Sequence, residues 1–237
     1  MNYVYSDTNR PFIKFIMKHS SHTVKSFEQE LDSLITSIQV MKDMAIDLIS
    51  LSQQSLVDSK KDFYKSAQLN DKKVNKLEKE IEEQAISLLA LRQPMASDLR
   101  IIVSTIKIIS LLERIADRGK KTIKVTRHLE APLSPAIIKE IFQMNKVVIH
   151  MINQVFRNLE SYALPELKEA IEEDDKVDEF YTQITQKIIN IQKTNPLPLE
   201  EFIAQIKILK NFERMGDYAT KIAKIIYYIA EGSNKKF

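Results

Sequence analysis

Apolar side chains recur every three or four residues along most of the chain, and this spacing lines one face of an α-helix. Proline interrupts the pattern at Gln93-Pro94 and again at Asn195-Pro196, because the residue before a proline disfavours the helical region. A milder break falls at Asn70 and Asp71, which favour caps and bends. The pattern predicts helices over residues 23–55, 62–69, 74–91, 94–128, 137–162, 166–173, 174–193 and 199–231.

One short pattern, apolar-Glu-Arg-apolar-small-Asp, occurs twice inside these helices, at residues 112–117 and 212–217. Each copy places its Glu four residues before its Asp: Glu113 and Asp117, then Glu213 and Asp217. Like charges at this spacing share a helix face and destabilise the helix by about 0.2–0.5 kcal/mol. Each pair also lies at the edge of the buried stripe, where partial burial adds to the cost. A chain that accepts this cost twice, 100 residues apart, is using the carboxylates.

The order of long helix, shorter helix and proline break also repeats, on either side of a linker at Ala131–Pro135. Short connections between the helices favour antiparallel neighbours. The sequence therefore predicts an all-α fold of two tandem, similar, antiparallel three-helix bundles. We expect an N-terminal tail over residues 1–20, a first bundle over 21–131 and a second over 132–237.

The amino-acid composition supports a helical fold and excludes several classes of function. The 237 residues include only 3 Gly and 7 Pro, and 44% are hydrophobic, which suits long helices with real cores. The net charge of +3 is too small to indicate nucleic-acid binding. Zero Cys excludes thiolate zinc sites and cysteine catalysis and agrees with a reducing cytoplasm. No apolar run is long enough to cross a membrane.

A second set of acids occupies matching places in the two halves, ahead of the repeated motif. Asp71 and Asn75 lie in the first half, and Asp174 and Asp178 lie in the second. In antiparallel bundles the helices that carry these residues lie beside the helices that carry the motif. Facing pairs would supply about four carboxylates in a complete set, and such oxygen ligands suit iron, manganese, magnesium or calcium, and zinc less often.

At these residues the chain resembles the PhoU family of phosphate-uptake and phosphate-signalling regulators. The resemblance runs from about His22 to Glu231 and rests on the twin motifs, on their Asp-x-x-x-Asp/Asn partners and on residues 93–100. It implies tandem three-helix bundles whose paired acids can bind multinuclear metal clusters. The metal ligands it implies are Asp71, Asn75, Glu113, Asp117, Asp174, Asp178, Glu213 and Asp217.

The resemblance also implies a regulator with no enzymatic activity. Members of the family couple a phosphate ABC transporter, through its ATPase, to a sensor histidine kinase. They repress phosphate-starvation genes when phosphate is plentiful. On this basis we expect a cytoplasmic protein, peripheral at the inner membrane, that forms a homodimer and binds no nucleic acid.

Two departures from the family pattern bear on the metal. Lys121 and Lys221 stand four residues after the motif Asp, where the family commonly has Asn, and an ammonium there can neutralise the acids without metal. Asn75 replaces a carboxylate, so the second half should bind metal more tightly than the first. The alternatives are an ion-pair network of the motif acids with neighbouring Arg and Lys, and a capping role for the earlier acids.

Three classes of function remain open. The first is a regulatory adaptor, favoured by the duplication and by the absence of a nucleophile–base arrangement. The second is a carboxylate-bridged metal protein with an enzymatic or storage role, which would need an open coordination position and a base. The third is a purely structural helical scaffold.

Overall fold

The computed structural model describes residues 22–58, 62–161 and 164–231. All regular secondary structure within these ranges is α-helical, which confirms the all-α class. The predicted tail at residues 1–20 lies outside the described residues.

The first half is built from three long helices, α2 (His22–Val57), α3 (Phe63–Arg92) and α4 (Ala96–Thr126). Two separate helices were predicted where α3 runs without a break, and that prediction was wrong. The apolar stripe explains the continuity, because Ala67, Val74 and Ile81 are all buried on one face and bridge the expected bend. The capping role considered for Asp71 is therefore also wrong, since Asp71 lies inside the helix.

The second half repeats this order with one helix divided. It consists of α5 (Pro135–Ser161), α6 (Leu164–Glu172), α7 (Asp174–Thr194) and α8 (Leu199–Glu231). α5 begins at a proline, which suits the first helical turn because its missing N–H needs no partner there. The Ser134 hydroxyl accepts a hydrogen bond from the backbone N–H of Ile137 at 3.4 Å and caps the same turn.

The two predicted proline breaks end helices at matching places. α3 ends at Arg92, and its C-cap Gln93 has a left-handed backbone (φ 45°) immediately before Pro94. α7 ends at Thr194, and its C-cap Asn195 stands immediately before Pro196. Each break turns the chain into the helix that carries the Glu-Arg motif.

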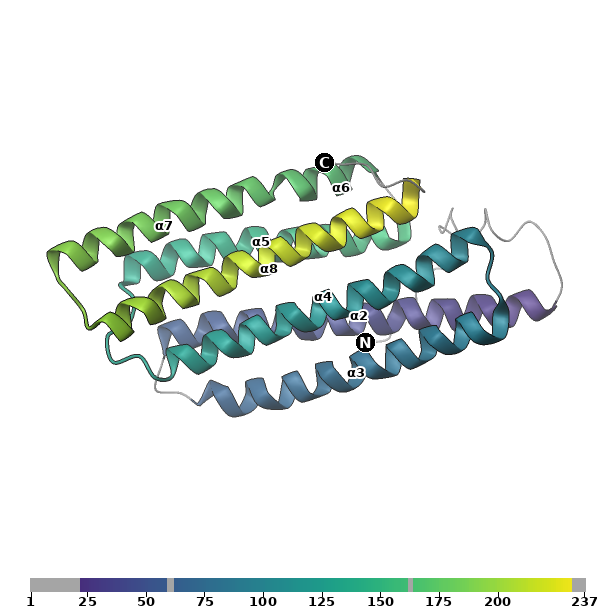
Figure 1. The fold of residues 1–237 in the computed structure, drawn as a ribbon, viewed down its shortest axis with the longest axis horizontal. Coiled ribbons are helices and arrows are strands. Elements are labelled where there is room, and N and C mark those ends of the chain that lie inside the picture. Colours follow the sequence, from purple (N-terminus) through teal and green to yellow (C-terminus); the bar gives the residue numbers. More distant parts are fainter. Residues whose placement is uncertain (1–21, 59–61, 162–163, 232–237) are drawn as a thin grey trace, which may run out of the picture.

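The motif helices α4 and α8 lie side by side at the centre of the molecule and run in opposite directions (Figure 1). Their contact is the most extensive between any two of the described helices, and it joins the two halves through one continuous hydrophobic core. The motifs contribute Leu112, Ile115, Phe212 and Met215, all completely buried. Burying a side chain of this size contributes about 1.5–3 kcal/mol. The two halves are therefore similar units that share one core.

A glycine on each motif helix allows a neighbouring helix to approach closely. A Cβ added to Gly119 would lie 2.8 Å from the backbone oxygen of Leu48 on α2. A Cβ added to Gly216 would lie 2.9 Å from a methyl group of Val177 on α7. α7 thus approaches α8 closely at Gly216, and α2 approaches α4 closely at Gly119, about one turn beyond the position equivalent to Gly216.

Candidate functional site

The motif acids lie near the middle of α4 and α8, and the earlier acids lie on the helices packed against them, α3 and α7. This placement follows the predicted pairing of helices within each half. The contacts of the acids differ between the halves.

In the first half a lysine occupies the space between the acids. The ammonium of Lys120 lies 2.7 Å from a carboxylate oxygen of Asp71 and 3.6 Å from one of Asp117. Lys121 lies 2.6 Å from the other oxygen of Asp117, as its spacing predicted. Asp71 is only 7% exposed, so these ion pairs hold a carboxylate that has left water. An ion-pair network accounts for these two acids.

Burial and neighbouring charges shift the pKa values of several groups in this cluster. Burial raises the pKa of Glu113 above its usual range, and the nearby carboxylates of Asp117 and Asp71 raise it further. Burial opposes the charge on Lys120, but the hydrogen bond to Asp71 and the neighbouring acids outweigh it and raise the pKa of that lysine. Burial also raises the pKa of Glu78 on α3, and Glu113 raises it further. The buried side-chain oxygen of Asn75 has no hydrogen-bond partner.

In the second half the motif acids form ion pairs with cations on their own helix, α8. Glu213, 7% exposed, forms an ion pair with Lys210, and Arg214 lies 3.0 Å from a carboxylate oxygen of Asp217. Lys221, expected to neutralise Asp217, lies instead over the ring of Tyr218 at 5.2 Å from its centroid. The expectation that Lys121 and Lys221 act alike in the two halves is therefore wrong.

Asp174 on α7 has no lysine equivalent to Lys120, which pairs with the matching Asp71 in the first half. Thr220 stands 100 residues after Lys120 and has no charge. Burial raises the pKa of Asp174 to about 6, the hydroxyl of Thr220 lowers it in part, the carboxylates of Asp178 and Asp217 raise it, and Lys224 has the smallest, lowering effect. The second half therefore gathers three acids without a lysine between them.

The predicted ligands are thus brought together only in part. Asp71, Glu113 and Asp117 influence one another in the first half, and Asp174, Asp178 and Asp217 do so in the second. Within the described part of the chain, no group of three or more His, Asp or Glu side chains is arranged so that it could hold a metal ion. The acids of the first half do not fit a metal with Lys120 in place, and the metal-binding prediction remains a prediction for the second half.

The sequence interpretation missed two residues that organise this cluster. Lys120 follows Asp117 by three residues, so the pair could have been expected, but its stronger contact is with Asp71 on another helix. Glu78 lies seven residues after Asp71, two turns along the same helix, and this spacing was the available signal.

Comparison with protein families resolves the resemblance. The family model described as "PhoU domain" matches the chain twice, at residues 38–126 and 141–226. The two matches correspond to the two halves of the fold and cover most of the chain. The chain belongs to the PhoU family.

Curated members of the PhoU family match over nearly the full length. The chain is 31% identical over 214 residues to the phosphate-specific transport system accessory protein PhoU homolog of Zymomonas mobilis, covering 89% of each chain. It is 32% identical to the homolog of the same name from Rhizobium meliloti, covering 92% of each. To the Escherichia coli accessory protein PhoU it is 26% identical, covering 91% of this chain and 89% of that one.

Solved structures of PhoU proteins share the fold. The phosphate transport system regulatory protein PhoU from Streptococcus pneumoniae superposes with a TM-score of 0.81 at 23% identity, covering 89% of this chain and all of that one. PhoU from Pseudomonas aeruginosa gives a TM-score of 0.81 at 25% identity, covering 87% of this chain and all of that one. Among the described residues of this chain, no helix combines the length and the apolar character needed to span a membrane.

Proposed function

We propose that this chain is a regulator of phosphate uptake that acts by binding and catalyses no reaction. The observation that supports this most is the double match to the PhoU family, because both halves of the shared core take part in it. The curated relatives are named as accessory proteins of phosphate-specific transport systems and match over about nine-tenths of both chains. In this proposal the chain joins the ATPase of a phosphate ABC transporter to a sensor histidine kinase, works as a homodimer at the cytoplasmic face of the inner membrane, and keeps phosphate-starvation genes repressed when phosphate is plentiful.

The contacts of the acids support a binding role. Asp71 and Asp117 are tied to Lys120 and Lys121, and Glu213 is tied to Lys210. Groups held in ion pairs stabilise a shape, and they are not poised to transfer protons. This arrangement favours a scaffold that presents surfaces.

Exposed apolar side chains at the helical turns supply candidate surfaces. Both turns that lead into motif helices carry them at equivalent positions, 100 residues apart: Leu91 and Ile191, Leu99 and Leu199, Val103 and Ile203. The α3–α4 turn and the α7–α8 turn lie at opposite ends of the molecule (Figure 1). Exposed apolar groups in such repeated positions favour contact with another protein. We infer that these turns contact the transporter ATPase.

The regulatory proposal is tested by deleting the gene and measuring phosphate-starvation transcripts in phosphate-rich medium. We expect the transcripts to rise, and to fall again when the wild-type gene is restored. Unchanged transcripts after deletion would refute the regulatory role.

The contact is tested by co-purification from membranes. The double variant Leu99→Lys/Leu199→Lys should lose the transporter ATPase, because a charge at the centre of each apolar turn must be desolvated on docking. Leu69→Lys is the control for an exposed apolar-to-lysine change, since Leu69 is 54% exposed near the start of α3, at the other end of that helix from the α3–α4 turn. Equal recovery of the ATPase with both variants would place the contact elsewhere.

Metal binding is the second candidate function, and the raised pKa of Asp174 beside Asp178 and Asp217 favours it. Among the described residues, no lysine lies between these three carboxylates. A bound cation would reduce their mutual repulsion by supplying the positive charge that Lys120 supplies in the first half. The residues that would hold the metal are Asp174, Asp178, Asp217 after release from Arg214, and Glu213 after release from Lys210. Iron, manganese or magnesium would supply charge compensation there.

A further inference from the structure

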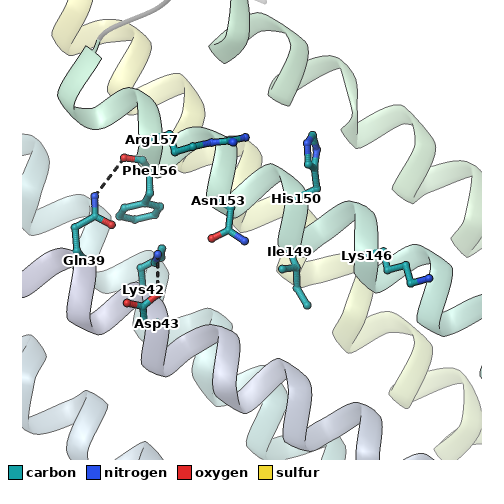
Figure 2. Close-up of a pocket in the computed structure, with 9 residues that line it drawn as sticks. All are labelled: Gln39, Lys42, Asp43, Lys146, Ile149, His150, Asn153, Phe156 and Arg157. Atoms are coloured by element: carbon teal, nitrogen blue, oxygen red, sulfur yellow. Dashed lines mark hydrogen bonds and ion pairs between the residues drawn. The ribbon is translucent and has the colours of Figure 1, made fainter. Parts of the chain in front are cut away.

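A cleft with a volume of about 870 Å³ lies between α2 and α5, the first helices of the two halves (Figure 2). The side-chain amide of Gln39 on α2 spans it and donates a hydrogen bond to the backbone carbonyl of Phe156 on α5 at 3.3 Å. This volume falls within the range of small-molecule sites. None of the acids discussed above lines the cleft.

One wall of the cleft carries a stripe of polar side chains on α5. Lys146, His150, Asn153 and Arg157 line it at intervals of four, three and four residues. This is the spacing of a single helix face, and the helical rise makes the stripe roughly 16 Å long. All four residues carry N–H donors, and two of them are permanent cations.

A further lysine faces this stripe from the opposite wall. Lys42 on α2 points toward α5, and Asn153 points back toward α2 (Figure 2). The Lys42 side chain is only 14% exposed, and its ammonium lies 2.7 Å from Asp43. Asp43 is itself 69% exposed and can turn into water. The cleft therefore holds three permanent cations, Lys42, Lys146 and Arg157, and a single carboxylate.

Several donors in the cleft are available to a ligand. The side chains of Lys146 and Asn153 make no hydrogen bond or ion pair within the described part of the chain. One ring nitrogen of His150 binds Glu173 at 2.8 Å, which leaves the other nitrogen for a second partner. A largely buried ammonium and an unpaired amide in one cleft attract an oxyanion, because the anion satisfies the open amide of Asn153 and can take the place of the exposed Asp43 beside Lys42.

We propose that the cleft between α2 and α5 binds an anion that carries a chain of phosphoryl groups. A single phosphate would reach only one or two donors of a stripe roughly 16 Å long. A chain of three or more phosphoryl groups contacts Lys146, Asn153 and Arg157 in succession along α5 and Lys42 across the cleft. Inorganic oligophosphate and the triphosphate of a nucleotide share this chemistry. The ligand contacts one helix of each half and adds to the core contact of α4 with α8.

The proposal stands on the cleft alone, and its test uses the purified full-length chain, so the result does not depend on the regulatory role. Binding of inorganic tripolyphosphate, ATP and inorganic phosphate is measured by calorimetry at low and at physiological salt. We expect tripolyphosphate to bind at least tenfold more tightly than inorganic phosphate, and salt to weaken it. ATP that binds more tightly than tripolyphosphate would identify a nucleotide as the ligand, and the reverse would identify inorganic oligophosphate; either supports the site.

Two variants and a control locate the binding. Lys146→Glu reverses an exposed charge in the stripe, and Lys42→Gln removes the cation of the opposite wall; each should weaken tripolyphosphate binding at least tenfold. Lys107→Glu makes the same change of net charge as Lys146→Glu, at an exposed position of α4, a helix that does not pack against α5. This control should bind as the wild type does.

Three results would overturn the site. They are no tripolyphosphate binding by the wild type at millimolar ligand, tighter binding of inorganic phosphate than of tripolyphosphate, and equal weakening by Lys107→Glu and Lys146→Glu. Circular dichroism of each variant shows whether the helices are intact.

Discussion

The two halves of this chain repeat one frame of helices but compensate their acids in different ways. In the first half Lys120 on α4 reaches across to Asp71 on α3, so the cation joins two helices. In the second half Thr220 occupies that position, the cations stay on α8, and Asp174 is left with a raised pKa. The carboxylates are retained in both halves, while the charge that balances them differs.

This difference separates two roles that one motif can serve. An ammonium held between helices acts as an internal counter-ion, and it fixes the pairing of α3 with α4. A cluster that lacks this ammonium carries unbalanced negative charge, which a bound cation or a proton can relieve. We therefore expect the first half to be the more structural and the second half to be the more responsive to metal and pH.

The largest effect is expected where the halves differ in what lies against the glycine of the motif helix, backbone at Gly119 and a side chain at Gly216. Gly119→Ala should destabilise the protein by about 3 kcal/mol, because the new methyl group meets the backbone of Leu48, which cannot move aside. Gly216→Ala should cost about 1 kcal/mol, since the methyl meets only a side chain and alanine favours the helix. Urea unfolding measures both; equal costs would show that the two approaches are equivalent.

Transferring the second half's residue into the first removes its counter-ion. Lys120→Thr should cost about 2 kcal/mol at pH 7, below the value for a fully buried pair because Lys120 is 26% exposed. The double variant Lys120→Thr/Asp71→Asn should recover most of this loss, because no buried charge then lacks a partner. An unfolding free energy for the double variant as low as that for Lys120→Thr would show that the lysine acts by packing.

Stability should depend on pH through Asp174 in the second half. Its folded-state pKa of about 6 lies above the ordinary value of 3.8, so the folded protein holds the proton more tightly and loses stability as pH rises between these values. Asp174→Asn should remove this loss and leave the variant more stable than the wild type above pH 6. Melting temperatures across pH 4–8 test it, with the exposed neighbour in Asp175→Asn as control. A variant that melts below the wild type at pH 7 would contradict the assignment.

The smallest effect is expected in metal affinity, because the acids of the second half form at most a weak site. In a manganese titration of Glu113→Gln/Asp117→Asn and Glu213→Gln/Asp217→Asn, the second variant should lose the tighter phase. Thr220→Lys, which places the first half's lysine in the second, should lose it too. Loss of the tighter phase in Glu113→Gln/Asp117→Asn instead would show that the first half binds metal more tightly. An absence of binding by the wild type at millimolar metal would leave the acids as an ion-pair network.

The helical class and the duplicated order could be predicted from the sequence because both depend on local spacing. The apolar period and the prolines at positions 94 and 196 mark helices that the structure contains. The break expected at Asn70 and Asp71 was wrong because the preference of these residues for caps is weaker than the continuous apolar face of α3. The burial of this apolar face against the neighbouring helices therefore keeps α3 helical through Asn70 and Asp71.

The counter-ions were harder to predict because they depend on contacts between helices. The ion pair of Lys121 with Asp117 follows from spacing along one helix. The contact of Lys120 with Asp71 requires the facing register of α3 and α4, which no local pattern specifies. Lys221 has the same spacing from its Asp as Lys121 has, yet lies over Tyr218, because the second half offers an aromatic ring where the first half has Arg118.

The antiparallel contact between α4 and α8 has a consequence for the origin of the molecule. Two copies of one surface that meet in opposite directions form the kind of interface found in symmetric homodimers. A chain of half this length, carrying one motif helix, could close the same core by pairing with a second copy of itself. Joining two such copies through a linker like the one at residues 127–134 would free each half to change on its own, and one could then keep a lysine where the other acquired a threonine.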